Sequence, residues 1–260
     1  MGDHKADRTG RILEFLTRKG RVEVDDLVVK LATSPATVRR ELARLERQGM
    51  IKRDRGGASL SVPSMFEPFL DQVTFANQVH QMSAEKTRIG ALAASLVKDA
   101  ETVGLAPGTT TTQVARFLQR RSNLTIVTNA VNIAMELCRK RDFRINLTGG
   151  LISGDWFALI GAKALEAIPN IRMDYFFFGA NGVTVENGVT DRHLEEAAIN
   201  RAMLRYASKR VLVVDHHKFQ NVAQCLVCPT SELHMIITDE NAGDELVEPF
   251  AKLGVQVLRA

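Results

Sequence analysis

Cysteine is scarce in this chain of 260 residues, which holds only three. Three cysteines cannot build the disulfide framework on which many small secreted domains depend. Cys225 and Cys228 have the spacing of a zinc or redox site, but no second pair of ligands accompanies them, and a structural zinc ion usually takes four. The neighbouring His216 and His217 lack a carboxylate-rich partner motif. We therefore predict buried free thiols at Cys225 and Cys228, no metal site and no cofactor.

Long hydrophobic runs are also absent. No apolar stretch approaches the roughly 20 residues that span a bilayer. The segment Met1–Gly10 is polar and lacks the apolar centre of a secretory signal. These absences predict a cytoplasmic protein with no membrane partner.

What the chain does contain is an uneven distribution of charge. The composition, 45% apolar and 25% charged, is typical of a globular protein long enough for two domains. Residues 1–60 contain 14 Lys and Arg against 9 Asp and Glu, whereas the rest of the chain contains 20 against 21. The basic excess therefore lies in the N-terminal segment, where it would attract a phosphate backbone.

An amphipathic helix is predicted within Thr33–Leu45. Ser34 suits its N-cap and Pro35 its first position. Apolar residues three or four positions apart form one stripe, made of Val38, Leu42 and Leu45. The other side carries Thr37, Arg40, Glu41 and Arg44. Adjacent arginines near the start of such a helix are typical of a major-groove recognition helix, although a surface helix with solvated charges has the same pattern.

The segments before this helix favour the DNA-binding interpretation. Arg8–Arg18 and Val24–Ala32 are predicted helices, and Arg21-Val22 between them is predicted to be extended. A tight turn at Ala32–Ser34 then leads into the recognition helix. This order is that of a helix-turn-helix.

The segments after the helix predict a hairpin. Two short extended runs, Met50–Arg53 and Ala58–Leu60, flank a turn that contains Gly56 and Gly57. A hairpin in this place is a wing, and its cations could rest on DNA phosphates or enter the minor groove. These cations are Lys52, Arg53 and Arg55.

The N-terminal segment resembles the DNA-binding domain of the DeoR family of bacterial transcriptional repressors. The shared pattern is Thr-Val-Arg-Arg-x-Leu, then Gly-x-Ile-x-Arg and Gly-Gly-Ala, and the likeness covers nearly all of residues 8–60. Glu41 stands where the family often has Asp. The resemblance implies a winged helix-turn-helix that binds double-stranded operator DNA, in which Arg39 and Arg40 either read a base or bind phosphate. The DNA-binding candidates are Ser34, Thr37, Arg39, Arg40, Arg44, Lys52, Arg53 and Arg55.

A domain boundary is predicted after the wing. The segment Ser61–Leu70 has no clear period, and Pro63 and Pro68 disfavour a continuous helix there. We therefore predict a DNA-binding domain at residues 1–60, a linker at 61–82 and a second domain at 83–260.

In the second domain, apolar extended runs alternate with helical stretches. The predicted strands are Thr102–Leu105, Leu124–Thr128, Arg144–Thr148, Met173–Gly179, Arg210–Asp215 and Leu233–Thr238. The predicted helices are Lys86–Val97, Thr110–Gln119, Asn132–Arg139, Glu195–Ala207 and Asp244–Leu253. This alternation predicts an α/β domain with a largely parallel sheet covered on both faces.

Ligand-type residues follow these strands at their carboxyl ends, where open parallel sheets bind ligands. Ala106–Thr112 is a Gly/Thr-rich turn at a helix N-terminus and offers N–H groups, hydroxyls and a dipole to an anion. A plain capped turn would have the same residues. Further strand ends carry Thr128-Asn129, Thr148–Gly150, Phe178–Gly182 and Asp215–Lys218. The abundance of Gly, Thr, Asn and Lys at these ends predicts a polyanion site.

Residues 84–239 resemble the sensor domain of the same family, through EKTRIG, GTTTT, TNA, GG, DYFFFGANG, EEA and DHHKF. That sensor is similar in turn to ribose-5-phosphate isomerase, in which a Gly-Ser-Thr turn binds the sugar phosphate with the help of two lysines. The resemblance places these roles on Gly108–Thr110, Lys86 and Lys218, and a proton-shuttling glutamate on Glu196. The implied effector-binding residues are Lys86, Pro107, Gly108, Thr109, Thr110, Thr111, Thr128, Asn129, Gly150, Gly179, Asn181, Gly182, Glu196, Asp215 and Lys218.

The catalytic loop of the isomerase is not retained. Its Asp-Gly-Ala-Asp-Glu sequence reads Phe178–Gly182 here, with Phe, Asn and Gly at the three acidic positions. Proton transfer between neighbouring carbons needs a positioned base and polarising partners. The resemblance therefore implies a domain that binds a sugar phosphate without turning it over.

These observations predict a DNA-binding transcriptional regulator that is not an enzyme. It would repress carbohydrate-metabolism genes, and a phosphorylated sugar or polyol would modulate its operator binding. Two-fold half-sites require at least a homodimer, and the resemblance allows a tetramer, nucleoid-associated when bound. Two alternatives are an active sugar-phosphate isomerase fused to a basic nucleic-acid-binding domain, and a nucleic-acid module that responds to no small molecule.

Overall fold

The protein forms two compact units, each of which is described by itself. The computed structural model describes residues 11–12, 15–16, 21–47, 51–60, 82–153, 157–168 and 171–260. All but the last residue of the predicted linker, 61–82, lie outside these ranges. The domain limits drawn from the sequence therefore stay a prediction.

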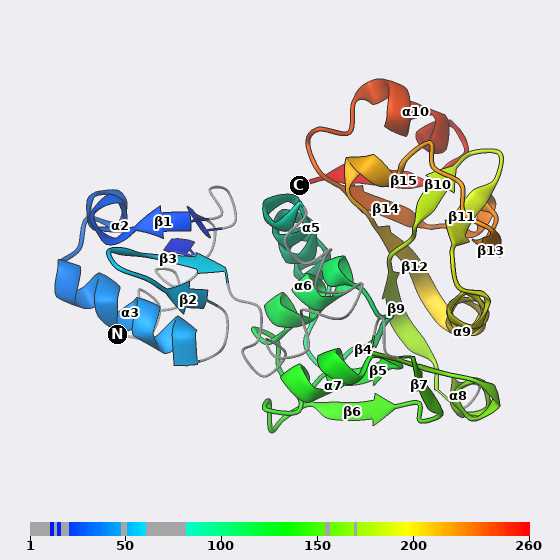
Figure 1. Cartoon of the computed structure of the whole chain (residues 1–260), viewed down its shortest axis with the longest axis horizontal. Coiled ribbons are helices and arrows are strands. Elements are labelled where there is room, and N and C mark those ends of the chain that lie inside the picture. The colour runs from blue at the N-terminus through cyan, green and yellow to red at the C-terminus, as the bar shows by residue number, and fades with distance from the viewer. Residues whose placement is uncertain are drawn as a thin grey trace. The chain divides into compact units, whose positions relative to one another are not determined.

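The smaller unit is a winged helix-turn-helix, as predicted (Figure 1). Its elements are β1 (Arg21–Glu23), α2 (Val24–Leu31), α3 (Pro35–Arg47), β2 (Ile51–Arg53) and β3 (Gly57–Leu60). Strand β3 pairs antiparallel with both β1 and β2. Ala32, with φ of 47°, ends α2 in the left-handed conformation and lets the chain turn into α3. Most of the predicted helix Arg8–Arg18 lies outside the described residues, but Arg11, Ile12, Phe15 and Leu16 are helical.

The apolar stripe predicted on α3 forms the core of this unit. Val38, Leu42 and Leu45 are buried, and they share the core with Leu27 of α2 and Ile51 of β2. Full burial of each such side chain contributes about 1.5–3 kcal/mol. The stripe therefore fixes which side of α3 remains at the surface.

The larger unit is built on a seven-stranded sheet, and every neighbouring pair of strands in it is parallel (Figure 1). In spatial order the strands are β15 (Gln256–Arg259), β14 (Met235–Thr238), β12 (Ala207–Val213), β9 (Met173–Phe178), β4 (Thr102–Leu105), β5 (Thr125–Thr128) and β6 (Arg144–Leu147). Phe176, Phe177 and Phe178 are all fully buried although successive side chains of β9 point to opposite faces. The sheet is therefore covered on both faces, as the sequence predicts.

The strand order reverses between β4 and β9 at the centre of the sheet. From β4 the chain moves outward through α6 (Thr109–Leu118), β5 and α7 (Val131–Leu137) to β6. From β9 it moves the other way, through α9 (Leu194–Arg205), β12, β14 and α10 (Asp244–Lys252) to β15. Right-handed crossovers then place α6 and α7 on one face and α9 and α10 on the other. Open sheets bind ligands at such a switch point, beyond the carboxyl ends of the strands.

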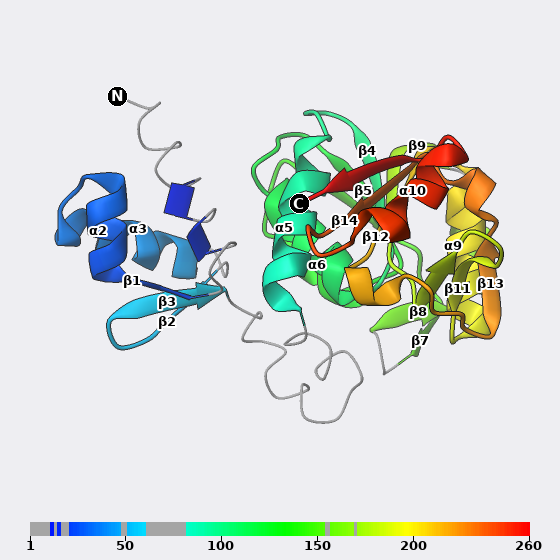
Figure 2. The same cartoon turned by 90° about the horizontal axis from the view of Figure 1, so that it is seen from above.

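Several smaller elements complete this unit, which Figure 2 shows from above. They are α5 (Ser83–Ser95), the hairpin of β7 (Leu151–Ser153) and β8 (Ala158–Ile160), α8 (Ala162–Ala167), the antiparallel strands β10 (Gly182–Thr184), β11 (Gly188–Asp191) and β13 (Cys225–Cys228), and the 3₁₀ turns η3 (His216–Lys218) and η4 (Thr230–Glu232). The sequence analysis did not predict β10 and β11, although Asn187-Gly188 between two valine-containing runs is a hairpin signal.

The cysteines are free, as predicted, but only part of their predicted burial is confirmed. Cys228 is buried in β13, whereas Cys225 is half-buried. Desolvation raises the pKa of the Cys228 thiol to about 12, so this thiol is unreactive at neutral pH.

Candidate functional site

The first candidate site is the surface of α3 opposite its buried stripe. Arg39 and Arg40 are exposed there, and neither forms an ion pair with a described residue. Ser34 caps the helix, because its Oγ accepts a hydrogen bond from Thr37 N at 3.3 Å and lies 2.9 Å from Thr37 Oγ1. The first turn contains no acidic residue. This end of α3 is therefore suited to an anion such as a DNA phosphate.

Two residues predicted for the polar side of α3 have a different role. Glu41 is only 3% exposed, and its Oε2 lies 3.3 Å from Nη2 of Arg44. The prediction that Glu41 faces solvent is wrong, because Glu41 lies three residues after Val38 and four before Leu45, within the buried stripe. Arg44 offsets the buried carboxylate, and its contact with DNA stays a prediction.

The wing carries the three predicted cations at its surface. Lys52, Arg53 and Arg55 are all exposed. Nη1 of Arg53 lies 3.7 Å from Oε2 of Glu46, so part of its charge is balanced within the protein. Arg55 lies in the turn and forms no ion pair with the residues that the structure describes, which leaves its guanidinium available for phosphate.

An ion pair that the sequence analysis missed holds the turn of the wing. Arg21 of β1 donates from Nε and Nη2 to the two carboxylate oxygens of Asp54, both at 2.9 Å. This interaction lowers the pKa of the Asp54 carboxyl. Asp54 N also donates to Gly57 O at 3.2 Å, which closes the turn. The spacing of 33 residues between the two partners carries no local sequence signal.

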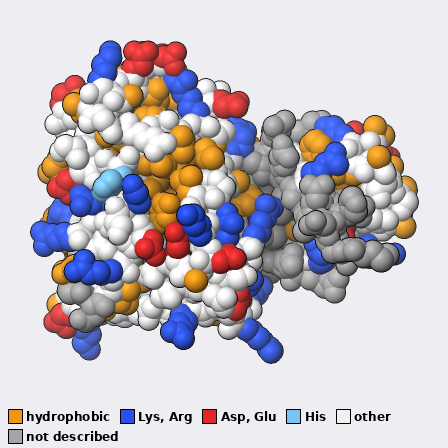
Figure 3. Space-filling model, turned by 180° about the vertical axis from the view of Figure 1, so that it is seen from behind, with side chains coloured by type: hydrophobic (Ala, Val, Ile, Leu, Met, Phe, Trp, Pro, Cys, Tyr) orange, Lys and Arg blue, Asp and Glu red, His pale blue; other side chains and the backbone are white. Residues whose placement is uncertain are grey.

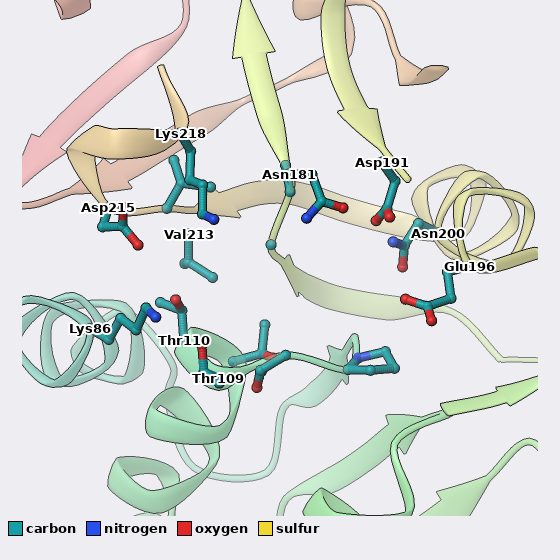
Figure 4. A pocket seen from close by; sticks show the side chains of 16 residues that line it. Lys86, Thr109, Thr110, Asn181, Asp191, Glu196, Asn200, Val213, Asp215 and Lys218 are labelled. Carbon is teal, nitrogen blue, oxygen red and sulfur yellow. The ribbon is translucent and has the colours of Figure 1, made fainter. Parts of the chain in front are cut away.

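The second candidate site is a cavity at the switch point of the larger unit. Its walls come from the ends of β4, β9, β11 and β12, together with α5, α6, α9 and η3 (Figure 4). Eleven of the fifteen predicted effector-binding residues line it: Lys86, Pro107, Gly108, Thr109, Thr110, Thr111, Gly179, Asn181, Glu196, Asp215 and Lys218. Lys86 and Lys218, 132 residues apart along the chain, therefore meet here, as the switch point requires.

The N-terminus of α6 forms one wall of this cavity. Gly108 precedes the helix with φ of 143°, a conformation that side chains with a Cβ rarely adopt. The hydroxyls of Thr111 and Thr112 donate back to Gly108 O at 3.0 and 2.7 Å. The side chains of Thr109 and Thr110 instead line the cavity (Figure 4). Three first-turn N–H groups and two hydroxyls are thus available to an anion.

Two lysines and one aspartate lie beside this helix end (Figure 4). Lys86 of α5 is 4% exposed, and desolvation lowers the pKa of its ammonium to about 8, with a smaller lowering from Lys218 and an opposing effect of Asp215. Asp215 is buried and caps η3 by accepting a hydrogen bond from His217 N at 3.2 Å. The cavity therefore holds two cations and one anion at this end, an excess of positive charge without a bound ligand.

Buried Asp239 at the end of β14 holds η3 in place. Its Oδ2 accepts from His216 N at 2.8 Å, and its Oδ1 lies 2.8 Å from His216 Nδ1. His216 directly follows Asp215 and lies two residues before Lys218, so Asp239 positions both cavity residues through η3. This contact gives His216 a structural role; no cluster of metal-type ligands occurs among the described residues.

The opposite wall contains polar residues that the sequence analysis missed. Asp191 at the end of β11 and Asn200 on α9 line the cavity with Asn181 and Glu196 (Figure 4). Asn200 lies one helical turn after Glu196, so the i, i+4 spacing was an available signal for it. Asp191 reaches the cavity only through the pairing of β11 with β10 and β13, which no local pattern indicates.

Four predicted effector-binding residues lie outside the cavity wall, and we withdraw them. The buried Thr128 hydroxyl donates to Leu105 O at 2.6 Å and accepts from Ala130 N at 3.0 Å, and the Asn129 amide donates to Leu159 O at 3.1 Å. Gly150 packs against the backbone of β8, and Gly182 lies in β10 against the backbone of Asn221. These residues contact the backbone of neighbouring strands and loops and do not line the cavity. Their small or polar side chains serve close packing and backbone hydrogen bonds.

Comparison with known proteins assigns both units to one family. Residues 8–63 match the DeoR-like helix-turn-helix domain, and residues 81–240 match the DeoR C terminal sensor domain. The chain belongs to the DeoR family. It is thus a DNA-binding transcriptional regulator with a sensor domain, as predicted, and the relatives found by sequence similarity are named as transcriptional regulators and repressors.

Relatives from the DeoR family match the chain over nearly its whole length. The glycerol-3-phosphate regulon repressor of Escherichia coli (strain K12) is 32% identical over 235 residues, which cover 90% of this chain and 91% of that protein. The HTH-type transcriptional repressor GlcR of Bacillus subtilis (strain 168) is 29% identical over 98% of this chain and 96% of its own. Among solved structures, ribose 5-phosphate isomerase A of Methanocaldococcus jannaschii has a TM-score of 0.39 at 16% identity, over 54% of this chain and 55% of that one.

Within the described ranges of this DeoR-family protein, no helix has the length and apolar character needed to cross a bilayer.

Proposed function

We propose that this DeoR-family protein represses carbohydrate-metabolism genes and that a phosphorylated sugar or polyol modulates its operator binding. The observation that carries the proposal is the cationic end of the cavity. Lys86, Lys218 and the N-terminus of α6 supply two charges, free N–H groups and hydroxyls around one point. The name of the glycerol-3-phosphate regulon repressor, which includes a phosphorylated polyol, supports the same class of ligand.

On the DNA side, we propose that α3 enters the major groove and that the wing rests on the backbone. Arg39 and Arg40 are the base-reading or phosphate-binding residues, and Ser34 and Thr37 contact phosphate near the helix start. Lys52, Arg53 and Arg55 contact the backbone beside the groove; the exposed cations support this assignment.

We propose that the protein acts as a homo-oligomer in the cytoplasm, on the nucleoid when bound. Two-fold operators need two copies of α3. Leu151 and Ile152 of β7 are largely exposed, and Figure 3 shows apolar side chains gathered on one face of the larger unit. Contiguous apolar surface is typical of protein interfaces and supports at least a dimer.

The acidic loop of the isomerase is not retained beside the cavity. At the position of its first acidic residue stands Phe178, which is fully buried in the core and offers no base. Asn181 and Gly182 replace the other two. Although Glu196, the implied proton shuttle, lines the cavity, the loss of this loop supports binding without proton transfer.

The experiment that tests this function is a gel shift on the promoter beside the protein's own gene, with a panel of phosphorylated sugars and polyols. We expect binding in the nanomolar range at physiological salt, changed at least tenfold by one member of the panel. Failure to bind this promoter, or any DNA more tightly than a random duplex, would contradict the repressor proposal. If no member of the panel changes DNA binding, the protein would be a DNA-binding module that does not sense these ligands.

Effector binding should depend on pH because of Lys86. A phosphate ester prefers the charged ammonium, whose pKa in the free protein is about 8, so binding at higher pH must take up a proton. We expect affinity to be constant between pH 7 and about 7.5 and to fall as pH rises above about 8. Calorimetric titrations at pH about 8.5 in two buffers of different ionisation enthalpy should show uptake of more than half a proton per ligand. Constant affinity from pH 7 to 9 would contradict the placement of phosphate beside Lys86.

The wing should contribute to affinity and not to sequence choice. Because the Arg55 guanidinium lies in the exposed turn, Arg55→Ala should weaken binding to operator and random DNA by the same factor and reduce the salt slope by about one. Salt titrations of both complexes measure this slope. Lys252→Ala, which removes an exposed charge from α10, is the matched control. A loss confined to the operator would show that Arg55 reads bases.

A further inference from the structure

The two ends of the cavity have opposite chemical character. Lys86, Lys218 and the N-terminus of α6 lie at one end, and Asp191, Glu196 and two asparagines lie at the other (Figure 4). We propose that the second end selects a monophosphate whose far end carries hydroxyl or ammonium groups, and that it rejects a ligand with a second anionic group there. This inference rests on the proposed function, because it assumes that the phosphate binds at α6.

Asn200 shows that this end is built for a ligand. Its side chain is 5% exposed and lines the cavity. Its amide atoms are not among the fully buried polar atoms that lack a partner, so they keep access to the cavity. An amide at the cavity surface can donate to and accept from a polar ligand, and this is the role that we assign to Asn200.

Asn181 and Asp191 are held in position before any ligand arrives. Arg192 N donates to Oδ1 of Asn181 at 3.1 Å and to Oδ1 of Asp191 at 2.6 Å, and His193 N donates to the same Asp191 oxygen at 3.3 Å. The engaged Asn181 oxygen leaves the amide Nδ2 for the cavity. One backbone turn therefore orients a donor and an acceptor toward the ligand without further ordering on binding.

Glu196 and Asp191 determine which tail is accepted. Carboxylate oxygens accept hydrogen bonds from hydroxyl and ammonium groups, and they repel a carboxylate or phosphate in a poorly hydrated cavity. Rejection by a misplaced like charge is a common source of specificity. The geometry thus points to monophosphates of sugars, polyols or amino sugars, and it excludes bisphosphates and phosphorylated sugar acids.

The test compares ligands that differ only at the far end. Full-length protein is titrated calorimetrically with glycerol 3-phosphate and 3-phosphoglycerate, with erythritol 4-phosphate and 4-phosphoerythronate, and with sorbitol 6-phosphate and 6-phosphogluconate, and separately with inorganic phosphate. Each pair shares its carbon number and its phosphate, and one member ends in a hydroxymethyl group where the other ends in a carboxylate. We expect the hydroxymethyl member of at least one pair to bind at least tenfold more tightly than its acid.

Variants of the acidic end then test which residues select the far end of the ligand. Asp191→Asn with Glu196→Gln should reduce the ratio within that pair to threefold or less and leave the affinity for inorganic phosphate within twofold. Glu248→Gln, on an exposed carboxylate of α10, should leave the ratio unchanged. Asn200→Leu should weaken the hydroxymethyl ligand about tenfold and yet raise the midpoint of thermal unfolding of the free protein, which a merely structural asparagine would not do.

The outcomes separate this inference from the proposed function. If inorganic phosphate binds but both members of every pair bind equally, or if the acid binds more tightly, the selection is overturned and the phosphate site stands. An unchanged ratio in the folded Asp191→Asn, Glu196→Gln protein also overturns it. If no phosphate binds at all, the proposed function fails and the inference fails with it. If the variants do not fold, the ratio of the two affinities within each pair, measured on the unsubstituted protein, still tests the proposed selection.

Discussion

Replacing Arg39 and Arg40 together by alanine is expected to weaken operator binding by about 100-fold or more. Both side chains are exposed on α3, on the surface left free by the buried stripe of Val38, Leu42 and Leu45. Each guanidinium that reads a base or binds phosphate contributes about 1–3 kcal/mol, and tenfold in affinity corresponds to about 1.4 kcal/mol. Fluorescence anisotropy with operator and random duplexes at several salt concentrations measures both the loss and its specificity.

The controls for this double variant test folding and net charge. Neither arginine forms an ion pair with a described residue, so the unfolding midpoint should stay unchanged. Lys209→Ala with Lys252→Ala removes the same charge from exposed positions of the larger unit and should alter affinity only slightly. If affinity falls for the operator more than for random DNA, the two arginines read bases. If it falls equally for both, they contact phosphates. Unaltered operator affinity would remove α3 from the DNA interface.

Replacing Lys86 by methionine is expected to abolish the effector response and to stabilise the free protein. Methionine keeps the length of the side chain and removes the ammonium. Losing a buried charge-assisted contact to phosphate should reduce effector affinity by about 100-fold, since such contacts are worth about 2–5 kcal/mol. Operator binding without effector should remain, because Lys86 lies in α5 of the larger unit and the proposed DNA contacts lie in the smaller one.

The gain in stability follows from the lowered pKa of Lys86. Its ammonium titrates at about 8 in the folded protein against 10.5 in the unfolded chain, so at pH 7 the folded state holds the charge at a cost of about 3 kcal/mol. Below about pH 8 this cost lowers the free energy of unfolding in full. Between about pH 8 and 10.5 the folded protein releases the proton that the unfolded chain still binds, so the cost decreases as pH rises. Removing the charge should raise the unfolding midpoint by about 4–8 °C for a gain of about 2 kcal/mol.

Calorimetry of the free and ligand-loaded proteins checks this pair of effects. Lys252→Met, at a largely exposed position on α10, is the matched control and should change neither stability nor effector affinity. A Lys86→Met protein that is less stable than the parent would show that the interactions of the ammonium within the protein outweigh the cost of its desolvation. If the variant still responds to the effector, the phosphate does not bind beside α5.

Much of the fold follows from local patterns that a reader can find in the sequence. The spacing of Val38, Leu42 and Leu45 predicts the packed face of α3, and strong apolar runs predict most strands of the parallel sheet. Short strands, and strands that pair with segments far away in the sequence, were not predicted. Strand β11 is one of these, because its pairing with β13 joins Asp191 to Cys225, 34 residues later.

The predicted effector-binding residues reach the cavity where they end a strand next to the switch point and lie outside it elsewhere. The turn after β4 and the Asp215–Lys218 segment both reach the cavity. Thr128 and Asn129 end a strand as well, but β5 lies one position beyond β4, away from the reversal in strand order. The Thr128 hydroxyl and the Asn129 amide nitrogen donate to neighbouring backbone oxygens. A strand end is therefore a site only if the strand order brings it there.

The amino-acid sequence by itself determined the two domains, the exposed arginines of α3 and the Gly/Thr-rich turn before α6, because each depends on residues close together along the chain. Only the tertiary structure decided that Glu41 is buried and neutralised by Arg44, and that Asp191 and Asn200 face Lys86 and Lys218 across one cavity. The physical reason is that burial and the meeting of strand ends depend on the order of strands in the sheet and on the packing of helices against it, which periodicity alone does not specify.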